Sequence, residues 1–241
     1  VNEGTIINLL NKASILSYSP VNFLGTKNNP IILDSKDGSG QGLIVLNAES
    51  RSSLSNLIVR NQSFKNKLGI TLTGAVTFYE SDIDLDNVQF LNNSAEDSLN
   101  IVRSDFSVIN SNFSESFSDA IDIDFGKGVI TNSNFIDIGN DGIDVSGSNV
   151  KISDIQMNNI GDKGISSGEK SNVKVEKVTI NNASIGVAVK DSSSLDGKNI
   201  FINSNQIGIA SYQKKSEYGP SYVSLNGLFL EKVKNNYLIE T

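Results

Sequence analysis

Large apolar residues recur along this chain with a period of about 22 residues. They stand at Val59, Phe90, Phe113, Phe135, Met157, Ile180, Ile202 and Leu230. From Phe90 to Ile202 the successive steps are 22 or 23 residues. A period of this length is typical of a solenoid, in which each repeat forms one coil and stacks on the next.

The polar positions follow the same period. Three residues before most of these apolar positions stands a polar residue, most often Asn, as at Asn110 and Asn132. Asn favours turns because its side chain bonds nearby backbone groups and tolerates left-handed dihedral angles. A small-apolar-polar-apolar tetrad then follows, such as Gly142–Val145. Its alternation predicts a short strand with two apolar side chains on one face.

The predicted fold is therefore all-β, a right-handed parallel β-helix. We expect a single-stranded solenoid of about 22 residues per coil, in which neighbouring coils pair at about 4.8 Å. In the segment Ser118–Phe125, the side chains of Ile121 and Ile123 are expected to point inward. Those of Asp122 and Asp124 are expected to point to solvent.

The chain divides into two parts by regularity. Residues 1–51 predict irregular N-terminal coils that continue from an upstream segment, and residues 52–241 predict regular coils of one continuous domain. An amphipathic cap helix over residues 5–16 is the alternative for the first part, because short apolar runs discriminate poorly between helix and strand. The run Tyr237–Ile239 reads as a strand with an open edge. Other domains of a larger protein, or neighbouring subunits, are therefore expected at the solenoid ends.

Composition and charge exclude several classes of chemistry. The chain has no Cys and no His, which excludes thiolate nucleophiles and imidazole bases. With 27 acidic and 20 basic residues, its net charge of -7 disfavours nucleic acid and anionic membranes as partners. No apolar run reaches the roughly 18 residues that suggest a membrane span, so no membrane insertion is expected.

Two columns of acidic residues follow the 22-residue spacing. Asp97, Asp119 and Asp141 form the first column, which continues at Lys163, and Asp122 and Asp144 belong to the second. If the coils stack, these carboxylates gather on one outward face, where they raise one another's pKa or attract a cation. Oxygen clusters suit Ca²⁺, so Asp122 and Asp144 are candidate calcium ligands. A solvated acidic surface is the equally weighted alternative.

The segments Asp119–Ile123, Asn140–Val145, Gly161–Ser166 and Gly186–Lys190 resemble the pectin-lyase-like β-helix superfamily. Within it they are most similar to the polygalacturonase pattern, over about residues 97–215. That resemblance implies that Asp119 and Asp141 match two catalytic Asp residues and that Lys163 takes the place of a His. Asn140 stands where the family has its general acid, and Lys190 alone remains of an Arg-x-Lys pair.

An amide cannot donate a proton as a carboxylic acid does, so the inverting mechanism lacks its acid. We take Asp119, Asp141 and Lys163 as candidate catalytic residues, although nearby carboxylates should raise the pKa of Lys163 and weaken it as a base. The candidate substrate-binding residues are Asp122, Asp124, Asp144, Glu169, Lys190, Tyr212, Lys214 and Tyr218.

Three functions remain open. The first is a non-catalytic or degenerate module that binds polysaccharide or a cell-surface glycan in an extracellular or cell-envelope protein, where the resemblance places it. The second is a polysaccharide lyase, hydrolase or epimerase that acts on an acidic glycan. The third is a structural or adhesive spacer. No cofactor is firmly indicated, and calcium is the one candidate.

Overall fold

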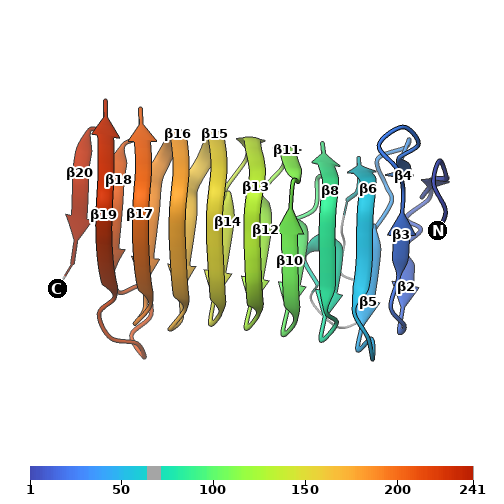
Figure 1. Cartoon of the computed structure of the whole chain (residues 1–241), viewed down its shortest axis with the longest axis horizontal. Coiled ribbons are helices and arrows are strands. Elements are labelled where there is room, and N and C mark those ends of the chain that lie inside the picture. The colour runs from blue at the N-terminus through green and yellow to red at the C-terminus, as the bar shows by residue number, and fades with distance from the viewer. Residues whose placement is uncertain (64–71, 241) are drawn as a thin grey trace.

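In a computed structural model of the chain, residues 1–63 and 72–240 are described. They form twenty β-strands and no helix (Figure 1), and so none that is long and apolar enough to span a membrane. The strands are β1 (Ile6–Asn8), β2 (Ile15–Ser17), β3 (Asn22–Leu24), β4 (Ile31–Asp34), β5 (Leu43–Leu46), β6 (Ser52–Arg60), β7 (Gly74–Tyr79), β8 (Ile83–Leu91), β9 (Asp97–Val102), β10 (Asp105–Ile109), β11 (Asn112–Ser116), β12 (Asp119–Asp124), β13 (Lys127–Ile138), β14 (Ile143–Ser146), β15 (Asn149–Gly168), β16 (Asn172–Lys190), β17 (Ser194–Asn203), β18 (Ile207–Tyr212), β19 (Tyr222–Glu231) and β20 (Asn235–Ile239).

The strands stack in three parallel ladders along one axis. Ladder A contains β2, β5, β7, β9, β12, β14, the ends of β15 and β16, β18 and β20. Ladder B runs from β3 to the first half of β19, and ladder C from β1 to its second half. The strands pair in parallel throughout the described part of the chain, and each coil returns the chain one step further along the axis. This is the expected parallel β-helix.

Aromatic rings stack in the core as the period predicts. The rings of Phe90 and Phe113 lie 4.7 Å apart between centroids, and those of Phe113 and Phe135 lie 5.0 Å apart, nearly parallel in both pairs. In the next coils, Met157 pairs with Phe135 and Ile180 with Met157. All five side chains are fully buried. Because each coil places its large residue directly over the last, the core is continuous.

The Asn positions form the corner between ladders B and C. Asn56, Asn87, Asn110 and Asn132 all adopt left-handed φ angles, between 47° and 55°. Their amides also bond from coil to coil: Asn87 Nδ2 donates to Asn56 Oδ1 at 2.6 Å, and Asn132 Nδ2 to Asn110 Oδ1 at 2.6 Å. The expected turn chemistry is confirmed.

In β12, Ile121 and Ile123 are fully buried, whereas Asp122 and Asp124 are partly exposed on the outward face. The predicted alternation is therefore confirmed.

The cap helix considered for residues 5–16 is wrong. This segment contains β1 and β2, which pair with β4 and β5 at offsets of 26 and 28 residues. Between them Asn11 and Lys12 adopt left-handed φ angles of 53° and 62°, which a right-handed helix does not allow. The segment therefore forms two short strands joined by a turn.

Candidate functional site

The outward face of ladder A carries both acidic columns. Asp97 pairs with Asp119 in the register of β9 and β12, and Asp122 pairs with Asp144 in that of β12 and β14. The backbone N–H of Asp141 donates to Asp119 Oδ1 at 2.9 Å, so Asp141 continues the first column on the coil after that of Asp119. We call this surface the acidic face.

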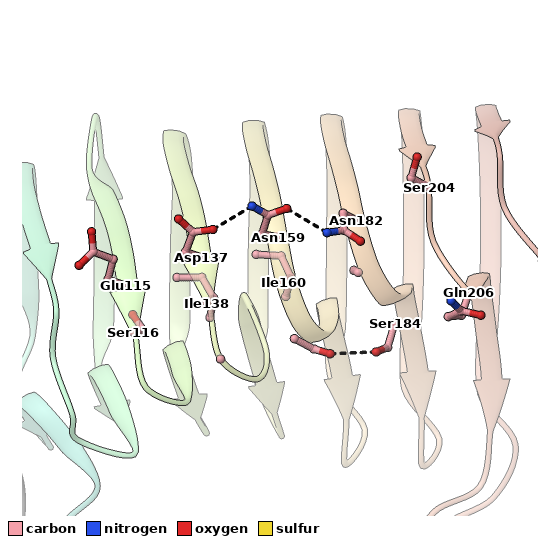
Figure 2. A pocket seen from close by; sticks show the side chains of 13 residues that line it. Glu115, Ser116, Asp137, Ile138, Asn159, Ile160, Asn182, Ser184, Ser204 and Gln206 are labelled. Carbon is pink, nitrogen blue, oxygen red and sulfur yellow. Dashed lines mark hydrogen bonds between the residues drawn. The ribbon is translucent and has the colours of Figure 1, made fainter.

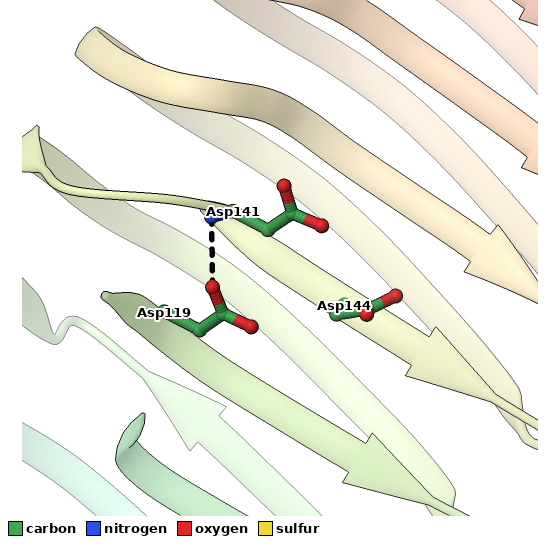
Figure 3. Close-up of side chains that lie close together, drawn as sticks. All are labelled: Asp119, Asp141 and Asp144. Atoms are coloured by element: carbon green, nitrogen blue, oxygen red, sulfur yellow. Dashed lines mark hydrogen bonds between the residues drawn. The ribbon is translucent and has the colours of Figure 1, made fainter. Parts of the chain in front are cut away.

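Three of its carboxylates converge (Figure 3). Asp119, Asp141 and Asp144 each offer an oxygen, and the three oxygens lie within 4.8 Å of one another. Asp119 and Asp144 are partly exposed, whereas Asp141 is only 2% exposed. The expected catalytic pair Asp119 and Asp141 is therefore brought together, with Asp144 as a third member.

Asn140 positions this group instead of donating a proton. Its Nδ2 donates to Asp119 Oδ1 at 2.6 Å, and the same oxygen accepts the N–H of Asp141. Asp141 Oδ1 in turn accepts the backbone N–H of Lys163 at 3.0 Å. Each carboxylate thus holds the start of the next coil, which fixes its orientation.

Burial is the largest cause of the raised carboxyl pKa values on this face. It raises the pKa of Asp97 to about 8, with the charge of Asp119 adding to the effect. It also raises the pKa of Asp141 to about 6, although Lys163 acts in the opposite direction. Burial and then the charges of Asp97 and Asp124 raise the pKa of Asp122 well above its usual value. Some carboxyl groups here are therefore protonated near neutral pH and can donate hydrogen bonds.

Lys163 is held as a cation. Its Nζ lies 3.4 Å from Asp141 Oδ1 and also forms an ion pair with Asp162. Burial acts to lower the pKa of Lys163, but these two carboxylates outweigh it and raise the pKa. Burial is the main cause of the raised pKa of the Tyr212 hydroxyl; the charge of Lys163 lowers this pKa and that of Asp141 raises it. Lys163 can therefore bind an anion here but is a poor base.

Lys190 lies one coil beyond Gly168, on the same side of ladder A. It is only 5% exposed, and its chain covers Gly168: a Cβ there would stand 3.5 Å from Lys190 Cε and 4.0 Å from Nζ. Among residues 1–63 and 72–240, no carboxylate forms a salt bridge with it. Ser166, which pairs with Asp144, is fully buried and its hydroxyl has no partner in the described part of the chain.

The loop after β18 is fastened to earlier coils. The backbone N–H groups of Lys214 and Lys215 donate to Asp191 Oδ1 at 2.7 and 2.8 Å. The ammonium of Lys215 pairs with Glu169, and Lys170 Nζ lies 5.7 Å from the centre of the Tyr218 ring. Lys215 and Tyr218 of this loop therefore contact Glu169 and Lys170 of an earlier coil. Within the described part of the chain, Lys214 forms hydrogen bonds through its backbone and not through its side chain.

Sequence reasoning missed three residues at this site. The side chain of Lys214 was expected in the site, but it is the neighbouring Lys215 whose side chain pairs with Glu169. Arg103 and Phe125 follow consecutive strands of ladder A, and the Arg103 guanidinium lies 5.5 Å from the centre of the Phe125 ring. Phe125 is 54% exposed and has a φ of 55°, which is uncommon for a bulky residue. Their 22-residue spacing was the available signal.

A divalent cation would meet oxygen donors in this site. Asp119, Asp141 and Asp144 supply a carboxylate cluster of the kind that Ca²⁺ prefers. Asp122, which was expected to be a ligand with Asp144, is outside this three-residue group. The donor set therefore suits a calcium ion, but Lys163 already places one positive charge beside Asp141.

Structural comparison relates the chain to three solved structures to different degrees. An alginate lyase from Paenibacillus sp. str. FPU-7 superposes with a TM-score of 0.57 and 10% identity, covering 99% of this chain and 93% of that one. The catalytic domain of a GH87 α-1,3-glucanase gives 0.41 and 9%, covering 99% and 60%. The receptor-binding domain of the Siphovirus 9NA tailspike gives 0.49 and 12%, covering 98% and 51%.

Of these three, the alginate lyase alone has a TM-score above 0.5, and at 10% identity its likeness concerns the fold. A search of curated proteins finds no match to the sequence. The family model described as right handed beta helix region matches residues 97–224, just over half of the chain. The chain therefore belongs to the right-handed β-helix family.

Proposed function

We propose that the acidic face binds an acidic polysaccharide. The observation that carries this proposal is Lys190, a lysine that is almost fully buried and has no salt-bridge partner in the described chain, on the same outward face as the carboxylate group. An ammonium that is held in place and has no salt-bridge partner in the described chain can form a charge-assisted contact with an anionic group. A carboxylate on the ligand would neutralise it.

The rest of the face provides complementary groups for such a ligand. Lys163 and the Tyr212 hydroxyl add a cation and a donor on the side of Lys190. The Asp144 carboxyl oxygens can accept hydrogen bonds from sugar hydroxyls, and Asp122, whose pKa is raised by burial, can donate one when it is protonated. A uronate-containing chain offers both hydroxyls and carboxylates. The alginate lyase of similar fold acts, by its name, on a glycan of this kind.

Cleavage of the bound glycan is the second candidate function. The raised pKa of Asp141, about 6, favours it, because a carboxyl group of this pKa can supply the proton that Asn140 cannot. We place the protein outside the cell or in the cell envelope, where such glycans occur, with Ca²⁺ as a candidate ligand of the carboxylate group.

We also propose that other domains or subunits cover the solenoid ends. In the last coil, Tyr222, Phe229 and Tyr237 are each more than half exposed.

The test compares the wild-type chain with Lys190→Met in calorimetric titrations with oligogalacturonate and oligoalginate. We expect the variant to bind about 10- to 150-fold more weakly, because it loses a charge-assisted contact of about 1.5–3 kcal/mol. Lys174→Met is the matched control, since Lys174 is exposed and lies on ladder B. The same mixtures are analysed for shortened or unsaturated products.

Equal affinity of the Lys190→Met variant and the wild type would contradict the proposed site. Product that forms with the wild type and is lost in Asp141→Asn, while binding persists, would establish cleavage over binding alone. The same product yield in both proteins would exclude Asp141 from the chemistry.

A further inference from the structure

A concave surface lies around the corner from the acidic face. It is a groove of about 540 Å³ where ladder C turns into ladder A. It crosses five consecutive coils, from Glu115 to Ser204 (Figure 2). Four steps of about 4.8 Å give it a length of about 19 Å, and its volume is within the usual range of ligand sites.

One wall of the groove is a ladder of polar side chains. Asn159 Nδ2 donates to Asp137 Oδ1 at 2.8 Å, and Asn182 Nδ2 donates to Asn159 Oδ1 at 2.9 Å (Figure 2). All three residues are exposed and have left-handed φ angles between 56° and 58°. Each amide uses one N–H in the ladder and keeps its second N–H free. The wall therefore repeats donors and acceptors at the coil spacing.

The floor of the groove consists of apolar side chains and of backbone at two glycines. Ile138, Ile160 and Ala183 line it in register. A Cβ on Gly139 would stand 2.0 Å from the Phe117 carbonyl oxygen, and one on Gly161 would stand 2.1 Å from the Gly139 carbonyl oxygen. Only glycine fits these two turns, and no side chain there covers the floor.

The charged residues of the groove distinguish between anionic and neutral ligands. None of the thirteen described residues that line it is basic, and Glu115 and Asp137 place two carboxylates at one end. The groove therefore has no cation to pair with the carboxylates of an anionic glycan, whereas Lys163 and Lys190 lie beside the carboxylates of the acidic face. A pyranose chain without charge fits instead, because its hydroxyl groups match the polar wall and its C–H surfaces match the apolar floor.

We propose that this corner groove binds a neutral oligosaccharide. The site is separate from the acidic face and does not depend on the function proposed for that face. An extended peptide is a poorer occupant, because peptides gain most affinity from free strand edges and the groove offers side chains instead.

The experiment measures binding of cellohexaose, xylohexaose, laminarihexaose and maltohexaose to the full chain by ligand-observed NMR and calorimetry. The double variant Asn159→Gly with Asn182→Gly removes the amides and retains the left-handed backbone. Its matched control is Asn110→Gly with Asn132→Gly. That pair forms an equivalent exposed ladder on Asp86, at 2.7 and 2.6 Å, outside the groove.

We expect at least one neutral hexasaccharide to bind, about tenfold more weakly in the groove variant and unchanged in the control and in Lys190→Met. No binding of any of the four sugars at millimolar concentration would overturn the proposal. Equal binding by the groove variant and the wild type would also overturn it. Failure of oligouronate binding in Lys190→Met tests only the acidic face, so the two proposals can fail separately.

Discussion

Asp97 shows what a single residue contributes on this face. It is 2% exposed, and its Oδ2 has no hydrogen-bond partner among the described residues. Burial raises its pKa from 3.8 to about 8, so the folded chain binds a proton that the unfolded chain has already released between about pH 4 and pH 8. The free energy of unfolding should therefore decrease as pH rises through this window.

Replacing Asp97 with Asn should remove part of this pH dependence. We expect the melting temperature of the wild type to fall from pH 5 to pH 8, and that of Asp97→Asn to fall less. Calorimetric scans over this range measure the difference. The exposed Asp105→Asn serves as control and should follow the wild type. Parallel slopes for all three proteins would show that Asp97 does not hold its proton in the folded state.

At the scale of the elements, stacked side chains stabilise neighbouring coils. Phe113 in β11 contacts a parallel ring on each side, in β8 and β13. Phe113→Ala should lower the free energy of unfolding by about 3–5 kcal/mol, because it leaves a cavity in the core. Urea unfolding measures this loss. Phe117→Ala is the control: Phe117 is 74% exposed, and its removal should change stability by less than about 0.5 kcal/mol.

A loss of less than about 1 kcal/mol in Phe113→Ala would contradict the stacked core. The stacked core and the alternation in β12 could both be predicted from the sequence, because both repeat with the 22-residue period. The alternative of a cap helix over residues 5–16 could not be excluded from the sequence, because the left-handed turn at Asn11 and Lys12 does not repeat with the period.

At the scale of the whole molecule, stability should decrease from the centre to the ends. Each coil contacts mainly its neighbours, so a terminal coil has support on one side only. Every residue of β20 is exposed, whereas β12 and β14 contain fully buried apolar residues. Hydrogen exchange followed by mass spectrometry should show slow exchange in β12–β17 and fast exchange in β1–β3 and β20. Uniform protection along the axis would contradict this gradient.

The sequence alone determined the solenoid, its inward apolar residues and the alignment of Asp97, Asp119 and Asp141. These features depend on contacts between equivalent positions of adjacent coils, and a regular period makes such contacts visible as a fixed spacing.

Only the tertiary structure decided the role of Asn140, the burial of Lys190, the pairing of Lys215 with Glu169, and the corner groove. These features depend on how side chains and an irregular loop reach from one coil to another. The direction of that reach is set by packing around each group, which the spacing of residues along the chain does not record.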